Sequence, residues 1–135
     1  MFAAIKKRVE TKDRLANLLG ITVIAAGHGY GKTSMPFTDN LRNPVDALHG
    51  GAIFTLADVA FGVASNFGES DVMVTTTSSI SFIKMAQSGP IVAEVRRVNG
   101  GKRMGTFSAQ VVDGEGTIIA TALLSGYRLD VPIKN

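Results

Sequence analysis

The chain has 135 residues, 45% of them hydrophobic and 19% charged, a balance that indicates one globular domain over residues 1–135 and excludes a disordered chain. It contains no cysteine, which excludes disulfides, thiolate zinc sites and cysteine catalysis. The net charge of +3 is mild, so we expect a solvated surface or a patch for an anionic ligand and, because the basic residues are not interleaved with aromatic ones, no nucleic-acid partner.

The first element expected in chain order is a helix over residues 2–19. Its apolar residues recur at roughly helical spacing, and Gly20 is a suitable stop signal. The segment from Lys6 to Arg14 carries seven charged residues, too many for the apolar region of a secretory signal. We therefore expect a cytoplasmic protein.

Residues 21–37 are expected to be strand-like, interrupted by glycines and by Pro36, and residues 38–48 to form a loop rich in turn formers. A long helix is expected next, over residues 50–67, with apolar side chains on nearly all faces. A helix that is apolar all round is buried. Asp58 interrupts the apolar stretch, so the stretch cannot serve as a membrane span and we expect no membrane partner.

Four consecutive strands in a meander are expected after the long helix, with a tail from Pro132. Their ranges are 72–84, 91–98, 104–112 and 117–129. Asn99-Gly100 predicts the hairpin turn between the second and third strands, since both positions tolerate positive φ. One long apolar helix must be covered, and a curved antiparallel sheet wrapped around it would do so, which predicts an α+β fold.

The triplet His49-Gly50-Gly51 stands at the start of the long helix. Backbone N–H groups there have no intrahelical partners, glycine lets another group approach them, and the helix dipole adds partial positive charge. Such a site can polarise a carbonyl and hold an oxyanion. The alternative is a purely structural role, in which the glycines make the start of the helix flexible and His49 caps it.

Asp58 is the only charged residue between His49 and Gly68. A carboxylate on a buried helix is costly unless it has hydrogen-bond partners or a function. Hydroxyls of residues 75–79 could be its partners. Alternatively, it acts as a nucleophile or general base. At ~1.5 Å of rise per residue, Asp58 lies about 10 Å or more from Gly50, too far for one carbonyl to touch both. Two antiparallel copies of the helix in a homodimer would bring Gly50 of one chain near Asp58 of the other.

Asn43, the His49-Gly50-Gly51 triplet and Asp58 together resemble the hotdog-fold acyl-CoA thioesterases of the phenylacetic-acid-degradation type, over about residues 43–127. The resemblance implies the hotdog fold, an antiparallel sheet wrapped around one long central helix, here with an N-terminal helix. It also implies that the Gly50 N–H, helped by Asn43, polarises the thioester carbonyl. Asp58 of the partner chain would then attack the carbonyl or activate water.

Further roles follow from the same resemblance. A hydroxyl on the strand after the helix places the attacking water, and Thr75 is the best match, with Thr76 and Thr77 as alternatives. His49 orients the loop and the carbonyl site. Phe82 lines the pantetheine channel or, alternatively, belongs to the core.

The loop Asn99-Gly100-Gly101-Lys102-Arg103 resembles the family's nucleotide-binding turn. A glycine turn exposes N–H groups, and Lys102 and Arg103 can meet the phosphates of coenzyme A. Of Arg96 and Arg97 only one is expected to contribute, because adjacent strand residues point to opposite faces. A solvated hairpin is the alternative.

The implied function is hydrolysis of an acyl-CoA to a free carboxylic acid and coenzyme A, in a homodimer or a dimer-of-dimers tetramer and without a cofactor. His28 and His49 are the only histidines and have no ligand spacing, so no metal site is expected. The alternatives are a non-catalytic acyl-CoA-binding or sensing hotdog protein, against which Asp58 argues, and a hotdog dehydratase or hydratase, whose His and acid arrangement we do not find. The acyl group stays open among aryl-acetyl, aromatic and medium-chain aliphatic acids.

Overall fold

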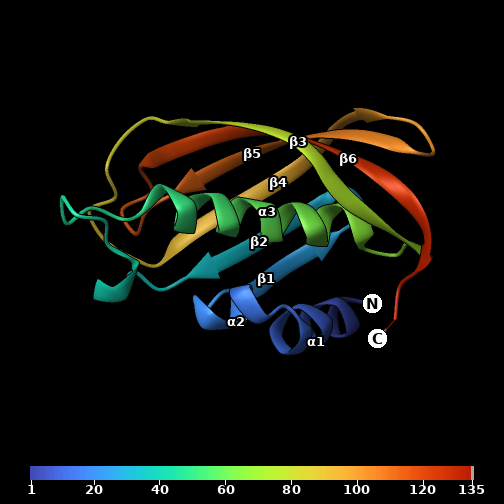
Figure 1. Cartoon of the computed structure of the whole chain (residues 1–135), viewed down its shortest axis with the longest axis horizontal. Coiled ribbons are helices and arrows are strands. Elements are labelled where there is room, and N and C mark those ends of the chain that lie inside the picture. The colour runs from blue at the N-terminus through green and yellow to red at the C-terminus, as the bar shows by residue number, and fades with distance from the viewer. Residues whose placement is uncertain (135) are drawn as a thin grey trace.

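The computed structural model describes residues 1–134, in which six antiparallel strands wrap around the helix α3 (Gly50–Asn66). Figure 1 shows α3 crossing the inner face of the sheet. The strands are β1 (Thr22–Gly27), β2 (Tyr30–Met35), β3 (Asp71–Phe82), β4 (Ile91–Gly100), β5 (Met104–Val112) and β6 (Ile118–Pro132). The expected α+β hotdog architecture is confirmed. No helix within residues 1–134 is both long and apolar enough to cross a bilayer.

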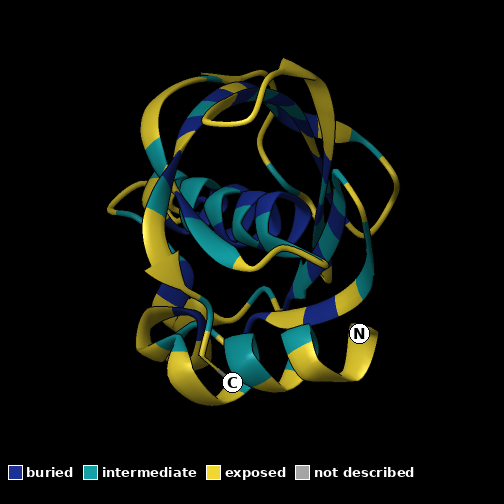
Figure 2. Cartoon of the chain, turned by 90° about the vertical axis from the view of Figure 1, so that its right-hand side faces the viewer, coloured by how far each residue is buried: buried dark blue, intermediate teal, exposed yellow. Residues whose placement is uncertain are grey.

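The apolar residues of α3 form the centre of the core, as their distribution around the helix predicted. Leu56, Ala60 and Phe61 are almost completely buried, and the Phe61 ring packs edge-to-face on Phe107 of β5 with 5.0 Å between centroids. Strand β2 passes so close to α3 that a Cβ on Gly31 would lie 2.5 Å from the Ala60 carbonyl oxygen. Figure 2 shows the buried residues concentrated on α3 and on the sheet around it.

The N-terminal helix is broken in two, which corrects the single helix expected over residues 2–19. It forms α1 (Phe2–Lys12) and α2 (Arg14–Leu18). Asp13 between them is extended, and its carboxylate accepts the Ala16 N–H and caps α2. The α1 helix has no buried residue and is attached to β1 by polar contacts, in which the Val23 N–H donates to Glu10.

The order of the strands is β1-β2-β4-β5-β6-β3, so the expected meander of four strands is wrong. Only β4, β5 and β6 form a meander, whereas β3 pairs with β6 and becomes an edge of the sheet. Polar residues suit an edge strand, because its outer side is not covered by another strand of the chain. The expected tail is also corrected, since Pro132 still pairs with Asp71.

The hairpin between β4 and β5 turns later than expected. Asn99 and Gly100 belong to the ladder, opposite Thr106 and Gly105, and the turn consists of residues 101–103. The extra residue in the β4 strand between Arg97 and Asn99 shifts the register there. Gly100, with φ of 148°, adopts a conformation that a side chain would disfavour, and this explains the glycine.

Candidate active site

The first turn of α3 offers one free backbone donor. His49 is the N-cap, and its Nδ1 accepts the Gly51 N–H over 2.8 Å, which is the capping role left open above. The Gly50 N–H has no hydrogen-bond partner among residues 1–134. A Cβ on Gly50 would lie 3.0 Å from the Phe82 ring, so glycine permits the half-exposed Phe82 to cover this helix end. Gly50, His49 and Phe82 are therefore brought together.

Asn43 shapes the loop that leads to this helix end. Its Oδ1 accepts the N–H groups of Val45 and Ala47 over 3.1 and 3.0 Å. The loop turns at Asp46, whose φ of 63° lies in the left-handed region. Because Oδ1 is occupied in this way, the side chain of Asn43 presents its NH₂ group as the remaining donor.

Asp58 is half-buried on α3, and Thr75 on β3 is its hydrogen-bond partner. The Thr75 hydroxyl donates to Oδ1 of Asp58 over 2.7 Å, while Oδ2 accepts no hydrogen bond from residues 1–134. Thr76 instead donates to the Ser125 carbonyl, because a bulge shifts the register between Thr75 and Thr77. Of the hydroxyls expected near Asp58, Thr75 is the one that the structure places against it.

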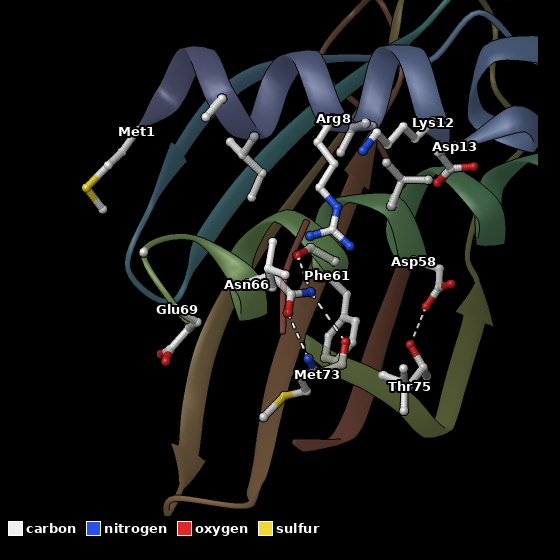
Figure 3. A pocket seen from close by; sticks show the side chains of 18 of the residues that line it. Met1, Arg8, Lys12, Asp13, Asp58, Phe61, Asn66, Glu69, Met73 and Thr75 are labelled. Atoms are coloured by element: carbon white, nitrogen blue, oxygen red, sulfur yellow. Dashed lines mark hydrogen bonds between the residues drawn. The ribbon is translucent and has the colours of Figure 1, made fainter. Parts of the chain in front are cut away.

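A cavity of about 780 Å³ lies between α1, α3 and the start of β3, with Asp58 and Thr75 in its wall. Figure 3 shows Arg8 reaching into it from α1, toward Phe61 and Asn66. The contribution of α1 was missed by sequence reasoning, because the apolar face of residues 2–12 also carries Arg8 and Lys12 and does not show which of these charges enters a cavity.

Gly50 and Asp58 are eight residues apart on one straight helix, which corresponds to about 12 Å along its axis. A single thioester carbonyl cannot reach both within one chain. The structure thus separates the predicted residues into a group at the start of α3, consisting of Asn43, His49, Gly50 and Phe82, and the pair Asp58–Thr75 in its middle.

The turn of the β4–β5 hairpin presents charge and not backbone donors. The Gly101 N–H bonds the Met104 carbonyl, and the Gly100 N–H bonds the Asn99 side chain, which corrects the expectation of exposed glycine N–H groups. Lys102 is exposed and forms no ion pair within residues 1–134. Arg103 donates to Asp130 over 2.7 Å, and this contact raises the pKa of the Arg103 guanidinium.

Arg97 and Arg96 differ in their surroundings, as expected for adjacent residues of a strand. The Arg97 guanidinium donates to the Gly101 carbonyl and so supports the hairpin turn. Arg96 instead lies over the Tyr30 ring. In Figure 1 the hairpin lies at the end of the molecule where α3 ends and β3 begins, far from Gly50.

Comparison with known proteins identifies relatives of this chain. The sequence model of the thioesterase superfamily matches residues 46–120. An Archaeoglobus fulgidus protein described as a putative esterase is 32% identical over 131 residues, which cover 96% of this chain and 84% of that protein. The Escherichia coli acyl-coenzyme A thioesterase PaaI is 28% identical over 80% of this chain and 77% of its own length.

Comparison with solved structures also finds proteins of the same fold. The E. coli PaaI structure has a TM-score of 0.85 and 27% identity, and the match covers 91% of this chain and 89% of that one. A Streptococcus mutans protein solved with acetyl-CoA has a TM-score of 0.75 at 22% identity, covers 84% of this chain and 91% of its own, and shares the fold.

Proposed function

Because this chain belongs to the thioesterase superfamily, we propose that it hydrolyses acyl-CoA thioesters to a free carboxylic acid and coenzyme A. The observation that carries the proposal is the pair Asp58–Thr75 in the wall of a cavity. The relative in E. coli, an acyl-coenzyme A thioesterase, supports the choice of substrate.

The pair supplies the base of the reaction. Oδ2 of Asp58 takes a proton from water while Thr75 holds Oδ1, and the water oxygen forms a bond to the thioester carbon. Collapse of the tetrahedral intermediate breaks the carbon–sulfur bond, and the leaving coenzyme A thiolate takes up the proton that Asp58 accepted, which restores the carboxylate. In a nucleophilic variant, Asp58 attacks the carbon itself and the carbon–sulfur bond breaks, so that the coenzyme A thiolate leaves. Water then hydrolyses the mixed anhydride, which releases the acid, restores Asp58 and supplies the proton of the thiol.

The start of α3 supplies the carbonyl-polarising half. The free Gly50 N–H and the NH₂ group of Asn43 both donate, and the helix dipole favours negative charge at this end. Together they stabilise the oxyanion of the tetrahedral intermediate. His49 takes no part in proton transfer in this account: it caps the helix and so fixes the direction of the Gly50 N–H.

The two halves meet between subunits of a homodimer. Strand β3 is an edge strand of 12 residues, and its outer side is unpaired within residues 1–134. Such an edge can pair with its own copy about a two-fold axis. Pairing there would place two α3 helices antiparallel on one continuous sheet, with Asp58 and Thr75 of one subunit facing Gly50 and Asn43 of the other.

Coenzyme A lies across the same interface in this proposal. The pantetheine arm passes Phe82, which covers the Gly50 end of the helix. The hairpin of the other subunit then meets the phosphates through Lys102, with Arg103 held beside it by Asp130. Acetyl-CoA bound to the S. mutans protein is a precedent within the fold.

Replacing Asp58 by Asn tests the function directly. The amide is nearly isosteric and can still bond Thr75, but it cannot take a proton or attack, so kcat on an acyl-CoA should fall by about 10²–10⁴-fold. Release of free thiol from a panel of acyl-CoAs measures it, with thermal unfolding and size-exclusion chromatography as controls for folding and assembly. Near-wild-type turnover by a folded Asp58→Asn protein would remove the catalytic role of Asp58.

A further inference from the structure

Arg8 is the one residue in the described chain with a buried side-chain nitrogen that has no hydrogen-bond partner, at its Nη1 atom. No carboxylate of residues 1–134 lies within 4.0 Å of its guanidinium. The arginines 42, 103 and 128 contrast with it, because each donates to a carboxylate or a backbone carbonyl.

The guanidinium points into the cavity that contains the proposed reactive pair. Arg8 extends from α1 on one wall, and Asp58 and Thr75 lie on another, as Figure 3 shows. Between them the walls include the apolar side chains Ile5, Val59, Phe61 and Met73. Apolar side chains therefore lie between the Arg8 guanidinium and the Asp58–Thr75 pair, while Lys12, Asp13 and Glu69 contribute further charges to the lining.

A buried guanidinium nitrogen without a hydrogen-bond partner is costly, and a bound anion removes this cost. The planar guanidinium donates in a fork that matches a carboxylate. The phosphates of coenzyme A cannot be this anion if the thioester is at Asp58, because the whole pantetheine arm separates them from the thioester. Of the parts of the substrate, the acyl group is then the one that can bring an anion to Arg8.

We propose that Arg8 binds a carboxylate at the far end of the acyl group, so that the preferred substrates are mono-CoA thioesters of dicarboxylic acids. The inference rests on the proposed thioester hydrolysis and names its substrate class. The apolar wall around Phe61 holds the hydrocarbon or aromatic part that joins the two ends. Arg8 selects the substrate and takes no part in bond breaking.

The test compares matched pairs of substrates over a series of chain lengths. Each pair is an acyl-CoA with a terminal carboxylate and the same acyl-CoA with that carboxylate as its methyl ester. At the length that fits the cavity, kcat/KM of the wild type should be about 10- to 100-fold higher for the carboxylate, the range for a hydrogen bond to a charged group. In Arg8→Met, kcat/KM should fall for the carboxylate substrate alone, so that the preference disappears.

Lys12→Met is the matched control. Lys12 lies one turn further along α1 and also lines the cavity, but its ammonium is directed to the carbonyl of Lys134. Removing this charge should leave the preference for the carboxylate unchanged. Arg8→Lys retains the charge but not the paired N–H donors of the guanidinium, and it should retain part of the preference for the carboxylate. Thermal unfolding of Arg8→Met should occur at the wild-type temperature or above, because a buried donor without a partner is removed.

Three results would contradict different parts of the account. Hydrolysis of both members of every pair at equal kcat/KM would overturn the role of Arg8 and leave thioester hydrolysis standing. Equal loss of both substrates in Arg8→Met would overturn it as well, since a general structural role would explain it. Failure of the wild type to hydrolyse any acyl-CoA would overturn the proposed function itself.

Discussion

Thr75 holds one oxygen of Asp58 and leaves the other free, which is the arrangement that a carboxylate base requires. Thr75 is β-branched, so its χ1 has few alternatives and the hydroxyl keeps its direction. The bulge beside it turns Thr76 toward the neighbouring strand and leaves Thr75 alone with Asp58. We therefore propose that Thr75 positions the carboxylate and its water.

Thr75→Val and Thr75→Ser form a pair that tests this role. The valine retains the shape and removes the hydroxyl, so kcat should fall by about 10- to 100-fold with little change in KM. The serine restores the hydroxyl and should recover most of kcat, an outcome that a purely steric role would not produce. Steady-state kinetics on one acyl-CoA measures both, and a valine variant with wild-type kcat would contradict the assignment.

The sequence singles out Asp58, because a lone charge on an otherwise apolar helix is conspicuous, and its catalytic role stays a prediction. Its link to Thr75 needed the resemblance to a family, since five consecutive hydroxyl-bearing residues offer no way to choose among them. Arg8 could not be predicted. The apolar residues of α1 recur at helical spacing but all stay partly exposed, and Arg8 and Lys12 lie on the same face, so the pattern does not show which of the two charges turns into the cavity.

At the scale of the element, α3 and the strands were predictable in type, but the place of β3 in the sheet was not. Alternation of polar and apolar residues shows which face of a strand is buried and says nothing of its neighbour. The turn was also misplaced, because Asn99-Gly100 has the composition of a tight turn while the bulge after Arg97 moves the actual turn to residues 101–103.

Phosphate binding by the β4–β5 hairpin can be tested separately. Lys102 is exposed and forms no ion pair in the described chain, so Lys102→Ala should raise KM for an acyl-CoA about threefold to tenfold and leave kcat unchanged, as expected for one screened contact to a phosphate. Arg103→Ala should do the same and also lower thermal stability, because its ion pair with Asp130 is lost. An N-acetylcysteamine thioester of the same acid lacks the phosphates and is the control. Equal effects on both substrates would exclude phosphate binding at the hairpin.

At the scale of the whole molecule, the proposed active site requires two half-sites from two chains. The free N–H at the start of α3 and the carboxylate in its middle are about 12 Å apart in one chain, and the unpaired edge of β3 provides a way to join two copies. One chain alone then has every reactive group and no complete site.

A variant of the first half-site can be made without disturbing the helix. Gly50 is the first residue of α3, a position that favours proline, and His49 before it has the extended conformation that a following proline requires. Gly50→Pro removes the N–H and should lower kcat by about 10²–10³-fold. Gly50→Ala adds the same Cβ near Phe82 but retains the N–H, and should stay within about tenfold of the wild type.

Mixing Asp58→Asn with Gly50→Pro subunits is the most direct test of the central claim. Each homodimer has both of its sites damaged, but a hybrid dimer has one site with Asp58 from one chain and Gly50 from the other intact. After unfolding and refolding in an equal mixture, half of the dimers are hybrids, and the activity should rise to about a quarter of the wild type. Activity that stays at the level of the separate variants, in a mixture shown to contain hybrid dimers, would contradict a site shared between two subunits.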